Sequence, residues 1–124
     1  MSRQRYLRGC NGQATVELAL ALPLLMVFLL GAVQVTLVIR GQLAVTHAAR
    51  AAARAASVSA SPTRAAAAAA VAATSLERLD VRTENGTRTV RVTVLARVPT
   101  DVPLVGALIG DVTVRATAVM AVES

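Results

Sequence analysis

The stretch at residues 18–39, LALALPLLMVFLLGAVQVTLVI, contains no charged side chain and decides the fold. Its strongly polar side chains are Gln34 and Thr36 alone. Its 22 residues, rising about 1.5 Å each in an α-helix, make roughly 33 Å, enough to cross the hydrocarbon core of a bilayer. The stretch therefore predicts one transmembrane helix. Pro23 removes one helical N–H donor, which membrane helices tolerate, so we expect a bend there and not a break.

The helical pattern continues beyond the apolar stretch, as RGQLAVTHAARAAARAAS over residues 40–57. Helical spacing places four polar side chains on one face of this segment and alanines on the opposite face; the four are Arg40, His47, Arg50 and Arg54. We therefore expect a single helix over residues 13–57, with its transmembrane span at 18–39 in lipid and its upper half in solvent.

The remaining residues, 58–124, predict a small domain with a second helix. Ser61 and Pro62 are a favourable helix start, with serine as N-cap and proline at the first helical position. The run that follows is rich in alanine, which favours helix and allows close approach of two backbones. The pattern predicts a helix over residues 62–77, packed on the alanine face of the first helix.

The end of the chain changes to a period of two, which predicts strands at residues 79–84, 87–98 and 111–122. Asn85-Gly86 is a strong signal for a two-residue hairpin turn. Such a turn would place Val81 opposite Val90 and Asp80 opposite Arg91. We expect a three-stranded antiparallel sheet with one face on the helices, which makes the fold class α+β. The inward side chains of the third strand would be Val112, Val114, Ala116, Ala118, Met120 and Val122.

Between the second and third predicted strands lies PTDVPLVGALIG, residues 99–110, where prolines and glycines interrupt any regular pattern. Its large apolar side chains need cover; they are Leu104, Val105, Leu108 and Ile109. Two interpretations stay open: a loop or short helix that caps an open edge of the sheet core, or a contact between subunits.

Composition limits the functional classes. The chain has 124 residues, room for one small domain and a membrane segment, so we expect no enzyme with a deep cleft of its own. Its net charge is +6 with arginine as every basic residue, and removal of residues 1–12 would leave about +3, weak support for nucleic-acid binding. Cys10 is the single cysteine, so no intramolecular disulfide can form.

The junction before the apolar stretch carries the functional signal. Residues 1–12, MSRQRYLRGCNG, are short, polar and basic, as in a leader, with arginines at Arg3, Arg5 and Arg8. Gly12 and Gln13 follow, and Glu17 lies five residues after Gly12. This arrangement resembles a type IV prepilin. The resemblance implies cleavage between Gly12 and Gln13 by a membrane-embedded prepilin peptidase, while the arginines hold the leader on the cytoplasmic side.

Glu17 is the acid at the edge of the apolar helix. A carboxylate costs about 2–3 kcal/mol at the bilayer centre and less near its surface, so a partner is expected. The prepilin resemblance implies that the partner is the new α-amino group of Gln13 in a neighbouring subunit. The alternative is an interfacial acid that only closes the membrane helix.

The wider stretch GQATVELALALPLL, with LAVTHAARAAARAAS after the span, resembles the TadE-like branch of the tight-adherence pilus proteins over residues 11–58. The resemblance implies a pilin-like fold and a minor pilin or pseudopilin, a structural subunit or assembly factor of a Tad (Flp) pilus or related secretion apparatus. Its partners would be the membrane, the prepilin peptidase, other pilin subunits and the assembly platform. It would cross the bacterial cytoplasmic membrane once, with a cytoplasmic N-terminus and an extracytoplasmic domain, and enter a surface pilus. Gln13 departs from the phenylalanine frequent at this position, which puts N-methylation in doubt.

Other classes fit less well. A secretory signal has an apolar region of about 7–15 residues, shorter than this span. No apolar region precedes Cys10, so a lipoprotein signal is not supported. His47 is the single histidine and has no clustered acids or cysteines beside it in sequence, so we expect no catalytic residue, metal, cofactor or small-molecule substrate. The main alternative is an uncleaved bitopic membrane protein that anchors an envelope complex or binds a partner within it.

Overall fold

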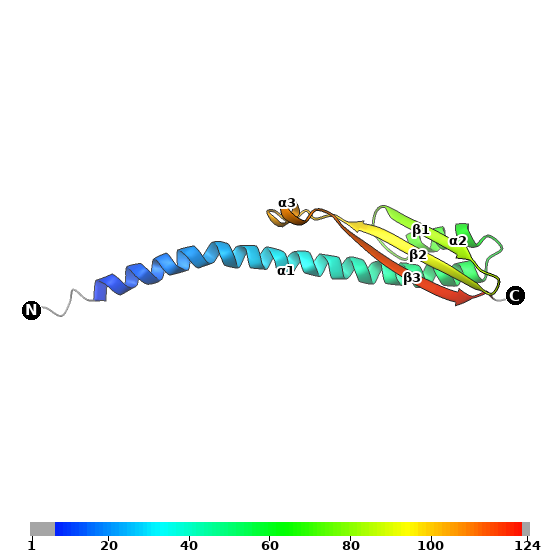
Figure 1. Ribbon diagram of the computed structural model, residues 1–124, viewed down its shortest axis with the longest axis horizontal. Helices are drawn as coiled ribbons and strands as arrows, with labels where there is room; N and C mark the ends of the chain where they lie inside the picture. Colours follow the sequence, from blue (N-terminus) through cyan, green and yellow to red (C-terminus); the bar gives the residue numbers. More distant parts are fainter. Residues whose placement is uncertain (1–6, 123–124) are drawn as a thin grey trace, which may run out of the picture.

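The computed structural model describes the backbone of residues 7–122 and the side chains of residues 12–122. One long helix forms a stem, and the remaining elements gather along its C-terminal half (Figure 1). The fold is α+β, as predicted. In chain order the elements are α1 (Leu7–Ser57), α2 (Pro62–Ala72), β1 (Leu79–Asn85), β2 (Thr89–Val98), α3 (Val105–Ile109) and β3 (Val112–Ala121).

Helix α1 has 51 residues and continues through Pro23 without a break, curving gently along its length (Figure 1). Its C-terminal end at Ser57 agrees with the prediction. Its start at Leu7 lies six residues before the predicted start at residue 13. The cause is propagation: extending an existing helix is far easier than nucleating one, and the glycines at positions 9 and 12 each cost only about 1 kcal/mol.

Helix α2 begins at Pro62, as predicted, although the Ser61 side chain makes no capping hydrogen bond. The helix ends at Ala72, five residues before the predicted end at residue 77. Local competition explains the difference, because the Leu76 N–H donates to Thr74 Oγ1 over 3.2 Å in place of a helical carbonyl. Arg78 then adopts a φ of 58°, which turns the chain into β1.

The three strands form an antiparallel sheet in the order β1-β2-β3, so consecutive strands are neighbours, as predicted. The predicted hairpin register is wrong by four residues: Val81 lies opposite Val94 and Asn85 opposite Val90. The turn is longer than two residues and is closed by a 2.8 Å hydrogen bond from Gly86 N–H to Thr89 O. A shift by an even number of residues leaves every side chain on the same face, so the apolar alternation could not distinguish the two registers.

The register also changes the charge pairs on the outer face. Arg91 lies opposite Glu84, and Asp80 lies opposite Leu95 instead of Arg91. Asp80 forms its ion pair within β1, with Arg82 at 3.1 Å. Both side chains are more than half exposed, so this pair contributes little to stability.

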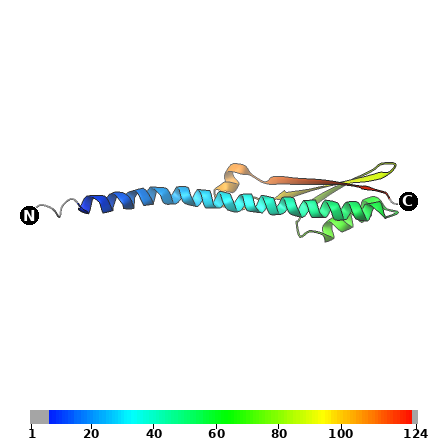
Figure 2. The same ribbon diagram turned by 90° about the horizontal axis from the view of Figure 1, so that it is seen from below.

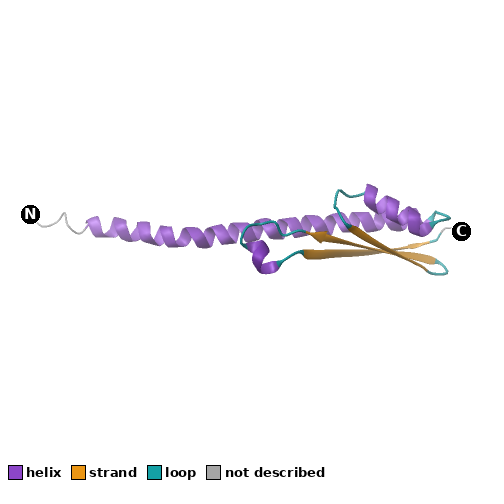
Figure 3. Cartoon of the chain, turned by 90° about the horizontal axis from the view of Figure 1, so that it is seen from above, coloured by secondary structure: helices purple, strands orange, loops and turns teal. Residues whose placement is uncertain are grey.

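The core lies between the sheet and the two helices. Helix α1 contacts β2 and β3, and α2 contacts β1 and α1. Figure 3 shows the sheet and α2 packed along the C-terminal half of α1. Fully buried valines of the sheet, Val90, Val92 and Val94, meet the small side chains of the helices. The alanine packing that the sequence predicts is confirmed, since the buried helix residues are Val45, Ala48, Ala49, Ala52, Ala53, Ala56, Ala66 and Ala70.

The inward side chains of β3 are also as predicted, with one exception. Val114 is buried, and Val112, Ala116, Ala118 and Met120 are partly buried, while the residues between them are exposed. Val122 lies one residue past the end of β3 and is exposed, although its N–H still donates to Arg88 O over 2.9 Å.

Candidate functional site on the stem helix

The N-terminal half of α1 is bare. Figures 1 and 2 show no other element beside it until α3 is reached. Large apolar side chains are exposed around the whole helix; they include Leu18, Leu20, Leu22, Leu24, Met26, Phe28, Val33, Val35 and Ile39. Within the described residues, α1 is the one helix long and apolar enough to cross a membrane, and only 6% of its most apolar window is buried in the chain. The core helix of a soluble protein would be mostly covered, so this surface fits a single-pass membrane anchor.

Gly12, Gln13 and Glu17 lie together near the start of α1, and all three are exposed. The side-chain amide of Gln13 donates a hydrogen bond to Glu17 Oε1 over 3.2 Å, one helical turn away. Sequence analysis did not anticipate this bond, although the spacing of four residues could have indicated it. The carboxylate therefore has a neutral partner within its own helix.

Gly12 lies in open surroundings as far as the described residues go. A Cβ placed there meets none of their atoms within 4 Å, and the backbone is helical. Of the predicted leader arginines, Arg3 and Arg5 lie outside the described residues, and Arg8 lies in α1 at a position where only the backbone is described. The structure therefore places the residues predicted for cleavage and pairing close together, while most of the predicted leader lies outside the described residues.

Gln34, toward the C-terminal end of the apolar stretch 18–39, belongs to a polar cluster that sequence analysis missed. It is only 4% exposed, and its amide donates to Thr100 Oγ1 over 3.1 Å. Thr100 Oγ1 in turn donates to Gly110 O, and the Thr100 N–H donates to Asp111 Oδ1 over 3.4 Å. A buried amide in an apolar helix signals a partner. Nothing in the sequence, however, pointed to Thr100, 66 residues away.

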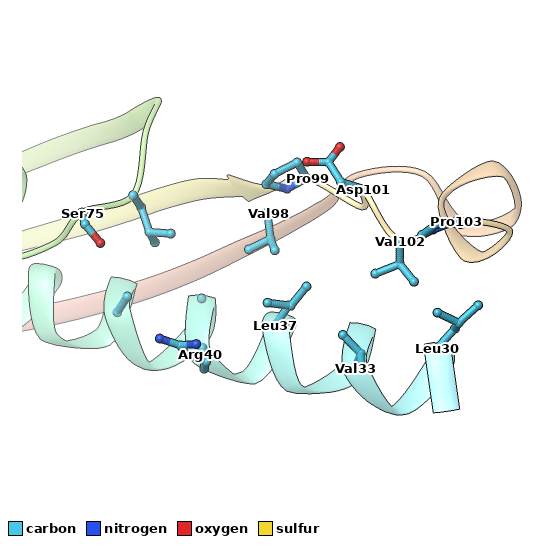
Figure 4. Close-up of a pocket in the computed structure, with 13 residues that line it drawn as sticks. Leu30, Val33, Leu37, Arg40, Ser75, Val98, Pro99, Asp101, Val102 and Pro103 are labelled. Atoms are coloured by element: carbon cyan, nitrogen blue, oxygen red, sulfur yellow. The ribbon is translucent and has the colours of Figure 1, made fainter. Parts of the chain in front are cut away.

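A groove of about 650 Å³ lies between the stem and the chain that follows β2. Figure 4 shows Val98 and Val102 pointing toward the stem, where Leu30, Val33 and Leu37 lie. Arg40 and Asp101 also line it. Most of the lining residues are apolar and offer apolar contact.

The polar face of the upper stem is exposed, as predicted, at Arg40, His47, Arg50 and Arg54. In the part of the chain that the structure describes, no three histidine, cysteine or acidic side chains cluster closely enough to hold a metal ion.

Comparison with known protein families gives a match to one segment of the chain. The family model described as "TadE-like protein" matches residues 12–54, which run from Gly12 through the bare half of α1 into the part that packs on the sheet. The chain matched no curated protein and no solved structure. This match confirms the resemblance inferred from the sequence, and residues 12–54 are similar to the TadE-like family.

Proposed function

We propose that this protein is a membrane-anchored structural subunit or assembly factor of a Tad (Flp) pilus, acting as a minor pilin or pseudopilin and not as an enzyme. The TadE-like family implies a pilin-like protein associated with this pilus, and its match to residues 12–54 carries the proposal. The architecture agrees, because a bare apolar half-helix is joined rigidly to a small folded domain. The bare half would contact lipid before assembly and the stems of neighbouring subunits afterwards.

The second step of the proposal is maturation by a prepilin peptidase between Gly12 and Gln13. A peptidase must reach an extended backbone, so α1 has to open at this point. Glycine lowers the cost of opening, because it is the least helix-favouring residue after proline. Support comes from the surroundings of Gly12, where no packing against the described residues requires glycine.

The third step assigns Glu17 to pairing with the new N-terminus. Cleavage would create a cationic α-amino group on Gln13, four residues and about 6 Å along the helix axis from Glu17. The existing bond from the Gln13 amide is neutral, so it leaves the negative charge of Glu17 uncompensated in an apolar environment. The α-amino group of a neighbouring subunit would supply that charge and set the axial register between stems.

The test uses the full chain expressed in its native host, with intact-mass measurement of the membrane and pilus fractions. We expect a chain that begins at Gln13, and we expect Glu17→Gln to be cleaved normally but largely lost from the pilus fraction. Glu84→Gln is the matched control, because Glu84 is an exposed acid on β1, in the folded domain. A pilus fraction that retains residues 1–12, or that contains Glu17→Gln at the wild-type level, would contradict the proposal.

One observation favours a second candidate, an uncleaved anchor of an envelope complex. Helix α1 starts at Leu7 and passes through Gly12 without interruption, as expected for a segment that stays in place. The same mass measurement separates the two candidates, because the anchor would retain its leader. In both cases we place the N-terminus in the cytoplasm and the domain outside the membrane. This orientation rests on the TadE-like resemblance, because three arginines precede the span and three follow it.

A further inference from the structure

We propose that residues 99–111, here called the α3 loop, form a second membrane-contacting element that inserts beside α1 into the leaflet on the domain side. The sequence left two interpretations of this segment, a cap on the sheet core or a contact between subunits. The observed loop extends past the end of the sheet and lies along the stem toward its bare half (Figures 1 and 2). It therefore lies beside α1, away from the open edges of the sheet.

The position of the loop along the axis of α1 places it beside the uncharged residues 18–39, here called the apolar zone. Val105 and Ile109 share a cavity with α1 residues between Phe28 and Val35. Arg40 is the first charged residue after Glu17 and marks the headgroup level on the domain side. Val35 and Phe28 precede Arg40 by five and twelve residues, so α3 lies about 8–18 Å deeper along the helix axis. Interfacial helices bury their apolar face by about 5–10 Å, which overlaps this range.

The outward side of the loop is apolar. Leu108 is 85% exposed, Leu104 65% and Ile109 62%, while Val102 and Val105 are buried on the stem side. The segment 103–110 contains no charge, and the acids Asp101 and Asp111 flank it. The exposed apolar surface of Phe28 and Val35 is at the same height on α1. The exposed apolar surface of the loop and that of the stem therefore lie at one height, and the proposed function places the stem in lipid. Acyl chains are the occupant that fits the loop.

The polar cluster explains how the loop is held at this depth. Thr100 Oγ1 accepts a hydrogen bond from the Gln34 amide and donates one to Gly110 O. The loop therefore covers the polar side chain that the stem would otherwise present to lipid. The loop and the stem therefore enter the apolar zone as one unit.

Leu104 adds a separate observation. Its φ of 68° is in the left-handed region, which favours glycine or asparagine over leucine. At 65% exposure its side chain gains little from packing within the chain. Contact with lipid gives an apolar side chain at this position a role that neither backbone preference nor internal packing provides.

The experiment places single cysteines in the full-length Cys10→Ser chain and labels each with an environment-sensitive fluorophore. The positions are Leu108, Leu24 on the bare stem, and Val71, a matched apolar control that is 65% exposed on α2. The chain is reconstituted at low density in phosphatidylethanolamine–phosphatidylglycerol vesicles that carry spin-labelled acyl chains. We expect positions 24 and 108 to lose most of their emission to the spin-labelled acyl chains and position 71 to keep its emission.

The inference requires that α1 crosses a membrane, as the proposed function states, but it does not depend on cleavage or on Glu17. If position 24 is quenched and position 108 behaves like position 71, the insertion of the α3 loop is wrong and the stem anchor stands. If position 24 is not quenched either, both the inference and the proposed anchor fail. If position 108 becomes shielded only as the protein density rises, the occupant is a second copy of the chain and the lipid assignment is overturned.

Discussion

Gly41 is a residue at which the stem closely approaches the sheet. It is buried, and a Cβ at this position would lie 2.5 Å from Val98 Cγ2, closer than such atoms approach in real proteins. Valine is branched at Cβ and cannot easily rotate away. The helix therefore contains glycine here for packing, in contrast to Gly12, whose surroundings are open.

We predict that Gly41→Ala destabilises the domain by about 1–3 kcal/mol through overpacking, partly offset by the higher helix propensity of alanine. Gly31→Ala is the matched control, because Gly31 lies on the same helix and a Cβ there meets no atom within 4 Å. The chain has no tryptophan and one tyrosine, so amide hydrogen exchange of β2 and β3 in detergent is a better measure than fluorescence. Equal exchange rates in the two variants would show that the close approach to Val98 has no energetic consequence.

At the scale of elements, the docking of the α3 loop on α1 depends on a hydrogen bond between distant residues. Gln34 Nε2 donates to Thr100 Oγ1, while Gln34 Oε1 is buried and has no hydrogen-bond partner among the described residues. Loss of one partner leaves the other buried and unsatisfied, whereas loss of both removes the polar groups together. The two side chains should therefore be strongly coupled.

We predict that Thr100→Val destabilises the docked loop by about 1–3 kcal/mol and that adding Gln34→Leu recovers most of this loss. Gln34→Leu alone should cost less, because it also removes the unsatisfied Oε1 and leaves the bond from Thr100 to Gly110 intact. Hydrogen exchange of the Gly106 and Gly110 amides, which donate to Val102 O and Gly106 O, measures the opening of the loop. Additive effects of the two substitutions would contradict the coupling.

These elements also show what the sequence could and could not predict. The apolar span, the alanine packing and the three strands follow from periodicity, which each segment carries by itself. The hairpin register, the early end of α2 and the Gln34–Thr100 bond depend on turn geometry or on residues far apart in the chain. The α3 loop was ambiguous for the same reason, since its position beside α1 is a tertiary property.

At the scale of the whole molecule, Glu17 and the folded domain lie toward opposite ends of α1. Glu17 lies 24 residues before Gly41, about 36 Å along the helix, and no part of the sheet approaches it (Figure 1). Sites so far apart without shared partners contribute independently to stability. Folding of the domain and the proposed assembly through the N-terminus should therefore be separable.

We predict that Glu17→Gln leaves the exchange rates of the sheet amides unchanged while it reduces recovery in the pilus fraction. Gly41→Ala should accelerate sheet exchange and leave Gln13 as the first residue of the processed chain, with its mass raised only by the added CH2 group, because the proposed cleavage site lies outside the folded domain. The double variant should show both effects without any additional loss of protection, and this additivity is measurable by combining intact mass with exchange on the same sample. Faster sheet exchange in Glu17→Gln alone would mean that α1 transmits a change at its N-terminus into the domain, so that assembly and folding are coupled through the stem.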